Sequence, residues 1–370
     1  MTAALAGVLG ALLAVILLWD VFETVLLPRR SAAPIRPSRL VFRALWWGWR
    51  AVAHVMRPGG RRETFLSFYP ILTLLLLLGI WAAGLILSFG LLFVAAGMGL
   101  ETQHGHLGFG TAVYMSGSTF LTLGLGDVVP LDAVERTITV FEAGTGLGFL
   151  ALFLSYMPVL YQSFSRREAR ITLLDSWSGS PPSSAVVLRR NAESGDPVAL
   201  ARLLREWESA SADLLESLIS YPVLAYFRSQ HDNQSWLASL TAVLDTCALV
   251  MAGVEGIPPF QARLTFAIAR HAVVDVAQVF RQPPCTSARD RLAADDFARL
   301  RQWLAQSGVK LIEGPEADDR LRALRAMYEP YVIALSQYLL MPLPTFLPPE
   351  RLRFNWQTTA WARTGRDAAH

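Results

Sequence analysis

Thr119-Phe-Leu-Thr-Leu-Gly-Leu-Gly-Asp127 is the stretch on which the interpretation of the whole chain depends. It reads as the end of an apolar helix, followed by two glycines, Gly124 and Gly126, with one residue between them. Glycine takes positive φ at little steric cost, so this spacing lets the backbone turn its carbonyls in directions that other residues resist. A Gly-x-Gly is common in proteins, so its meaning here depends on the flanking segments.

The apolar residues of the chain are concentrated in its first half. The chain has 370 residues, of which 53% are hydrophobic, and its mean hydropathy of +0.35 is too high for an ordinary soluble protein. Nearly all long apolar runs precede residue 162, whereas the remainder has the composition of a soluble domain. We therefore predict an all-α membrane protein in which the membrane helices are followed by a helical domain.

Three apolar segments are long enough to cross a bilayer, which takes about 20 residues. They are an N-terminal transmembrane helix within residues 1–28, an uncharged run at 66–98 and a third run at 134–162. Arginines fill the loop 29–64 and recur directly after the third span, at 166–170. Because arginines in loops stay in the cytoplasm, we expect a multi-pass protein of the inner or plasma membrane, with its N-terminus outside and its C-terminus in the cytoplasm.

The arginine-rich loop contains a segment, Leu40–Met56, that has the character of an interfacial helix. Basic residues recur at helical spacing on one face, and tryptophans, which prefer headgroup depth, supply the membrane-facing rings. These residues are Arg43, Arg50, His54 and Arg57, with Trp46, Trp47 and Trp49. The alternative is a helix that packs against protein.

Ionisable residues at two other places raise the question of a functional site. Asp20 and Glu23 lie near the end of the first span, where we expect Arg29 and Arg30 to neutralise them. The outer loop 99–110 carries Glu101, His104 and His106, a combination that can bind a metal or sense acid. Two histidines in a glycine-rich loop are more often solvated, and we expect that here.

The segment Gly108–Leu121 lies between the second span and the paired glycines and is too short to cross a membrane. Irregular backbone at membrane depth is tolerated only where protein or a water-filled cavity surrounds it. We therefore predict a re-entrant half-helix. If it ends near Thr119, its C-terminal partial negative charge favours a cation in the cavity beyond.

The paired glycines and their neighbours resemble the potassium-channel signature T-x-x-T-x-G-x-G-D. The matching residues are Thr119, Thr122, Gly124, Gly126 and Asp127. The resemblance covers a two-span pore module at about 65–165 and implies four identical chains around one axis in a lipid bilayer. It implies an ion-binding filter of backbone carbonyls, an acid ring at the outer mouth and support from the pore helix. The filter would be Thr122, Leu123, Gly124, Leu125 and Gly126, the mouth Asp127, and the support Ser118 and Thr119. Permeant K⁺ would be the only ion held, with no cofactor and no other metal.

The third span has the features of a pore-lining inner helix. Gly144, Gly146 and Gly148 weaken it locally and Pro158 removes a hydrogen bond. The resemblance places a hinge and gate here, for which the candidates are Gly144, Gly146, Leu147, Leu150, Leu154 and Pro158. Glu142 is the one charge deep in this span. It either has a structural role, in which it hydrogen-bonds the back of the pore helix at Ser116, Ser118 or Thr119 or is protonated, or it attracts ions directly.

Some residues depart from the family pattern. Leu125 replaces the usual aromatic residue and cannot make the hydrogen bonds of a tyrosine hydroxyl. Tyr114 and Met115 stand where many relatives carry a tryptophan pair, and Ser118 stands where some carry a glutamate. A weakly selective cation channel is therefore an alternative to a potassium channel.

The part after the third span gives fewer signals. We predict a Ser/Gly/Pro-rich linker at 166–197 and an all-helical cytosolic domain at 198–370 that gates the inner helix in response to an unknown ligand. The sequence has no P-loop, Gly-x-Ser-x-Gly or metal-ligand spacing, and nothing points to nucleic acid, so an enzyme is not expected. No span carries an arginine ladder, which argues against a voltage sensor. A membrane-anchored signalling or binding module with a non-conducting pore is the alternative from another class.

Overall fold

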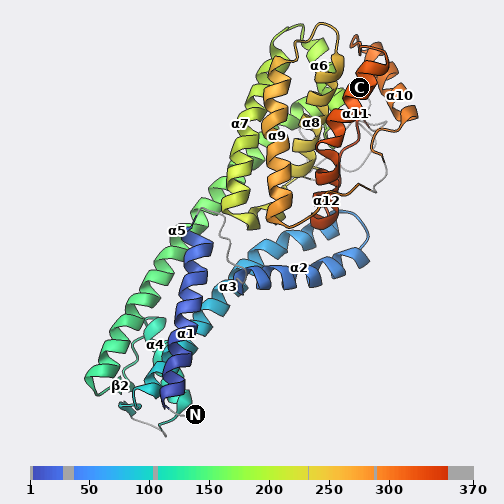
Figure 1. Ribbon diagram of the computed structural model, residues 1–370. Helices are drawn as coiled ribbons and strands as arrows, with labels where there is room; N and C mark the ends of the chain where they lie inside the picture. The colour runs from blue at the N-terminus through green and yellow to red at the C-terminus, as the bar shows by residue number, and fades with distance from the viewer. Residues whose placement is uncertain (1–2, 28–36, 103–106, 232, 287–289, 349–370) are drawn as a thin grey trace, which may run out of the picture. The chain divides into compact units, whose positions relative to one another are not determined.

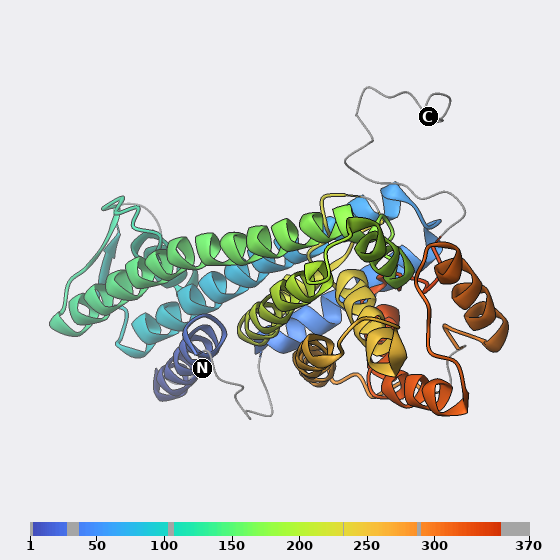
Figure 2. The same cartoon turned by 90° about the horizontal axis from the view of Figure 1, so that it is seen from above.

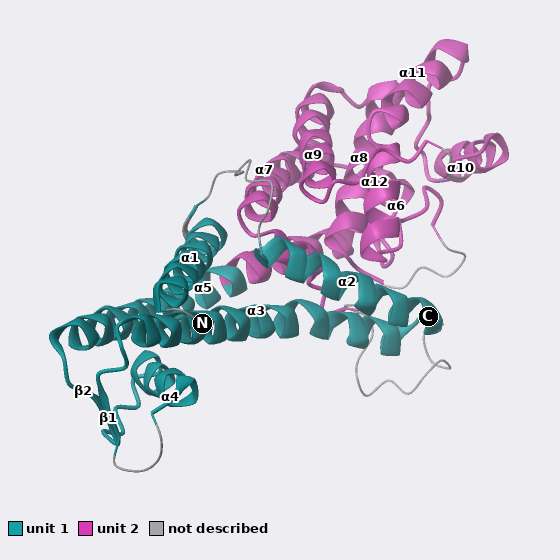
Figure 3. Cartoon of the chain, turned by 60° about the horizontal axis from the view of Figure 1, so that its bottom comes forward, with its two compact units in different colours: residues 1–161 teal, residues 162–370 magenta. Residues whose placement is uncertain are grey.

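The computed structural model describes residues 3–27, 37–102, 107–231, 233–286 and 290–348. The chain divides into two compact units, residues 1–161 and 162–370 (Figure 3). Residues Arg29, Arg30, His104 and His106, for which the sequence suggested roles, lie outside the described residues.

Unit 1 is built from long apolar helices with one short two-stranded antiparallel sheet (Figure 1). Its elements are α1 (Ala3–Val21) with a π-helical turn (Phe22–Leu26), α2 (Pro37–Val55), α3 (Gly60–Ala95), β1 (Leu100–Thr102), α4 (Phe109–Phe120), β2 (Val128–Pro130) and the first part of α5 (Ala133–Ser178). The expected spans coincide with α1, α3 and α5, and the expected half-helix with α4. The all-α membrane class is thus confirmed, with β1 and β2 as a small addition.

Among the described residues, four helices are long and apolar enough to cross a membrane: α1, α3, α5 and α8 (Trp236–Gly253). The last of these was not expected to span. Its side chains are almost all buried within unit 2, and a helix that is apolar on every side is suited to the core of a bundle. We interpret α8 as a core helix.

The N-terminal helix packs closely along α3. A side chain at Gly10 would lie 2.8 Å from the carbonyl oxygen of Ser88, so only glycine allows this approach. Ser88 uses the proximity to donate a 2.7 Å hydrogen bond from Oγ to the carbonyl of Gly10. Small residues and interhelical hydrogen bonds of this kind are what hold membrane helices together, because lipid gives apolar contacts no advantage. The first helix is therefore packed as part of unit 1.

The predicted pairing of Asp20 with Arg29 and Arg30 falls outside the described residues, and the structure shows further partners for this side chain. Its carboxylate is buried and accepts hydrogen bonds from Ser38 and from the indole of Trp81. The sequence pointed to nearby arginines because these are close along the chain. The fold also brings donors from α2 and α3 to this carboxylate, which lie far from it along the chain.

The predicted interfacial helix is present as α2, and its tryptophans divide between two environments. Trp46 is buried with its ring 4.7 Å from that of Tyr69, and Trp49 stacks on Phe65 at 4.6 Å. Trp47 is 78% exposed. One face of α2 therefore packs on α3, as the alternative interpretation required, and contact of the other face with lipid stays a prediction.

Unit 2 is a helical bundle arranged around α8 (Figures 1 and 2). Besides the end of α5, it contains α6 (Ser184–Ser194), α7 (Ala199–Ser220), a 3₁₀ turn (Pro222–Tyr226), α8, α9 (Phe260–Val279), α10 (Ala294–Gln306), α11 (Pro315–Ala326) and α12 (Glu329–Leu339). The side chain of Ser235 accepts from the backbone N–H of Ala238 and so caps the start of α8.

The predicted linker at 166–197 is largely helical. The α5 helix continues without a break to Ser178, and α6 occupies 184–194 with Ala185–Leu188 buried. The non-helical parts of this range are 179–183 and 195–197. The serines and prolines suggested a loop by composition, but the apolar run Ala-Val-Val-Leu that follows them is long enough to bury one face of a helix against α8.

Candidate functional site

The end of α4 and the strand β2 frame a short irregular segment, 121–127. The strand that follows this segment, β2, pairs antiparallel with β1, which precedes α4, in the register Leu100↔Pro130. The backbone N–H of Leu131 extends the pairing by donating to the carbonyl of Gly99 at 2.8 Å. The loop that contains α4 is therefore closed at its base by backbone hydrogen bonds.

The backbone of the segment alternates in a way that is rare in proteins. Thr122, Gly124 and Gly126 have φ values of 58°, 60° and 77°, whereas Leu123 and Leu125 do not have positive φ. Two of these three positions are glycine, for which positive φ has little cost. Reversal of φ at every second residue turns over alternate peptide groups, so that successive carbonyls can face one side.

Ser118 in the last turn of α4 collects the backbone donors of this segment. Its carbonyl accepts from the N–H of Leu123 at 2.8 Å and of Gly124 at 3.4 Å, and its Oγ accepts from the N–H of Leu125 at 3.5 Å. Three successive N–H groups therefore point toward α4. Because each peptide group is trans, the carbonyls of the same three peptide groups point away from α4.

Tyr114 and Asp127 form a second connection between α4 and the segment. The Tyr114 hydroxyl donates to Asp127 Oδ2 at 2.8 Å. The sequence identified Tyr114 only as a departure from the family pattern and predicted no partner for it. Thus the segment, whose Leu125 has no hydroxyl, is attached to α4 through Ser118 at its middle and through Tyr114 at its end.

Glu142 contacts the back of α4, as one of its two predicted roles required. Ser116 Oγ hydrogen-bonds Glu142 Oε1, and Ser116 Oγ also lies 2.8 Å from the carbonyl of Ile86 in α3. Glu142 is fully buried, and its Oε2 has no hydrogen-bond partner among the described residues. This arrangement joins α3, α4 and α5 behind the segment.

The candidate gate residues lie on an uncovered face of α5. Leu147 is 61%, Leu150 49% and Leu154 63% exposed in the single chain. The helix continues through Pro158. An exposed apolar face of a membrane-spanning helix can contact lipid, a neighbouring subunit or a cavity, and the single chain leaves this face available for any of these.

Gly146 has a role that the sequence did not reveal. A Cβ at this position would lie 2.1 Å from the carbonyl oxygen of Phe120, the last residue of α4. Gly144 and Gly148 have no atom within 4 Å of an added Cβ. The structure thus gives Gly146 a packing reason, close approach of α5 to α4, and the predicted hinge at Gly144 and Gly146 stays a prediction.

Comparison with known proteins agrees with this geometry. Residues 74–162 match a family model described as ion channel. No curated protein and no solved structure matches the chain. The matched residues contain most of α3, all of α4, the irregular segment and the first part of α5. The match supports a pore module of the potassium-channel superfamily at residues 74–162.

Proposed function

We propose that the chain forms a homotetrameric potassium channel in which the backbone carbonyls of Thr122–Gly126 bind the permeant ions. The observation that carries the proposal is the attachment of three consecutive N–H groups to Ser118, together with positive φ at every second residue. Carbonyl oxygens that face one axis replace the water shell of K⁺. Asp127 follows the filter and supplies an acid ring at its outer mouth.

Four chains are needed because one loop provides only one side of a filter. The single chain leaves apolar residues of α5 uncovered, with Val140 at 73% and Phe141 at 71% exposure. These residues and the gate candidates supply surfaces for neighbouring subunits and for a central cavity. Unit 2 gates the pore through α5, which is unbroken from Ala133 to Ser178, in response to a cytosolic ligand.

The test is ion flux into liposomes that contain the purified protein, with K⁺ and Na⁺ measured separately. Gly126→Ala should abolish flux, because the added Cβ opposes the φ of 77° that Gly126 adopts. Gly79→Ala is the matched control, since an added Cβ there meets no atom within 4 Å. Unchanged conduction in Gly126→Ala would contradict the proposed filter.

The same assay separates the alternatives. Similar K⁺ and Na⁺ fluxes would identify a weakly selective cation channel. Absence of flux from the wild-type protein under every tested ligand, pH and voltage would favour the signalling or binding module with a non-conducting pore.

A further inference from the structure

The N-terminal helix has no assigned role in the proposed pore, which needs only α3, α4 and α5. Yet α1 buries a carboxylate, Asp20, that is 2% exposed. A carboxylate away from water is expensive unless hydrogen bonds satisfy it. The hydrogen-bond partners of Asp20 therefore indicate which parts of unit 1 are connected through α1.

Asp20 joins three helices. It accepts from the backbone N–H of Ser38 at 3.0 Å, from Ser38 Oγ at 2.8 Å and from Trp81 Nε1 at 2.9 Å. Ser38 is in the first turn of α2, where backbone N–H groups lack partners in the helix and a negative charge is favourable. Trp81 is in the middle of α3. One carboxylate thus fixes the start of α2 to the outer helix of the pore module.

Aromatic contacts continue from Trp81 to the pore loop. The Trp81 ring meets Phe149 of α5 edge-on, with centroids 6.4 Å apart, and Phe149 lies 5.7 Å from the ring of Phe120. Trp81 and Phe120 belong to one buried cluster, against which Phe149 packs. Phe120 is the last residue of α4, and its carbonyl is the atom that approaches Gly146. The contacts therefore reach the base of the filter.

We propose that Asp20 is a positioning residue that couples the first turn of α2 to the selectivity filter through Trp81, Phe149 and Phe120. Densely packed side chains transmit displacement because they have few alternative arrangements. A movement of α2 at the membrane surface thereby changes the position of Phe120 and the firmness with which Ser118 holds the filter. The inference rests on the proposed function where conduction is the readout, and on the pore-loop geometry alone where it is not.

Hydrogen exchange of the filter amides tests the coupling without conduction. In the tetramer in liposomes, Ser38→Ala removes one donor to Asp20 and leaves the pore module unaltered in sequence. Exchange in a peptide covering 119–127 should become about two- to ten-fold faster, the factor that corresponds to one hydrogen bond. Ser67→Ala is the matched control, because among the described residues the Oγ of Ser67 bonds the carbonyl of Thr64 in its own helix. Exchange at 119–127 equal to that of the wild type would overturn the proposal.

A second variant tests the route. Trp81→Phe removes the indole donor, and Trp47→Phe, at an exposed position of α2, is its control. If Ser38 and Trp81 both act through the Asp20 carboxylate, hydrogen exchange at 119–127 in the double variant Ser38→Ala/Trp81→Phe should be no faster than in the single variant with the larger effect. Additive effects would overturn a shared route. If Trp81→Phe does not assemble, as judged by size-exclusion chromatography, Ser38→Ala alone decides.

The flux assay then separates this inference from the proposed function. A change in filter exchange in a wild-type-like tetramer that passes no ion would support the coupling and contradict the channel. Normal flux with unchanged exchange and unchanged K⁺ to Na⁺ preference in Ser38→Ala would support the channel and contradict the coupling.

Discussion

The Tyr114 hydroxyl connects Asp127, at the end of the irregular segment 121–127, to α4. This hydrogen bond holds the Asp127 carboxylate against α4. We expect Tyr114→Phe to assemble normally, because the ring stays, but to lose several-fold in K⁺ over Na⁺ preference as the filter becomes less rigid. Permeability ratios in liposomes check this, with Tyr331→Phe in α12 as the control. Equal ratios in wild type and Tyr114→Phe would show that the bond does not support selectivity.

Individual contacts differed in how far they could be predicted from sequence. The partner of Glu142 was predictable because a buried acid behind a re-entrant helix needs a donor, and α4 offers few. The bond between Tyr114 and Asp127 was not, since it depends on how the chain returns after the filter. The described donors to Asp20 come from two other helices, so proximity along the chain could not identify them.

Gly146 in the inner helix allows α5 to approach the end of α4 closely at Phe120. Gly146→Ala should force the two helices apart, because the added Cβ would meet the Phe120 carbonyl at 2.1 Å, and overpacking of this kind costs about 1–3 kcal/mol. We expect a lower melting temperature of the tetramer in detergent and loss of flux.

Gly144→Ala and Gly148→Ala are matched controls in the same helix, where an added Cβ has open space within the chain. They should assemble and conduct like the wild type if close packing is the reason for glycine. Equal loss of flux in all three variants would instead favour a flexible hinge and contradict the packing role.

Secondary elements followed from the sequence where the pattern was long and apolar, as in α1, α3 and α5. Some short elements could not be predicted in this way. The strands β1 and β2 have three residues each, too few for an alternating pattern to identify them. The α6 helix was missed because serine and proline precede it, although its burial depends on apolar residues that contact α8. Composition indicates which segments are exposed, but whether a short segment forms a helix or a strand depends on its tertiary contacts.

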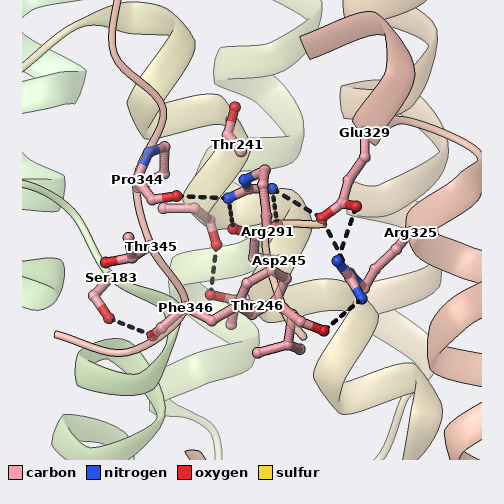
Figure 4. Close-up of polar contacts among 12 residues, drawn as sticks. Ser183, Thr241, Asp245, Thr246, Arg291, Arg325, Glu329, Pro344, Thr345 and Phe346 are labelled. Atoms are coloured by element: carbon pink, nitrogen blue, oxygen red, sulfur yellow. Dashed lines mark hydrogen bonds and ion pairs between the residues drawn. The ribbon is translucent and has the colours of Figure 1, made fainter. Parts of the chain in front are cut away.

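At the scale of the whole molecule, the proposed gating by unit 2 requires a rigid core in that unit. A polar network around Arg291 supplies one part of it (Figure 4). Arg291 donates to both oxygens of Asp245, at 3.1 and 2.7 Å, and to the carbonyl of Pro344 at 2.8 Å. Burial and the nearby Asp245 raise the pKa of Tyr328 well above its ordinary value, so its hydroxyl stays protonated and donates to Asp245. Phe346 lies against the guanidinium of Arg291 at 5.2 Å. The network pins the segment after α12 onto α8.

Arg291→Ala should destabilise unit 2 by about 3–5 kcal/mol, because it leaves the buried carboxylate of Asp245 without its cation. Hydrogen exchange of α8 in the full-length protein measures this. Arg322→Ala removes an exposed pair with Asp319 and should cost less than about 1 kcal/mol. Since α5 runs unbroken from the pore module into unit 2, a loosened unit 2 should also change K⁺ flux in Arg291→Ala and leave it unchanged in Arg322→Ala. Faster exchange of α8 with wild-type flux would mean that unit 2 does not control the pore.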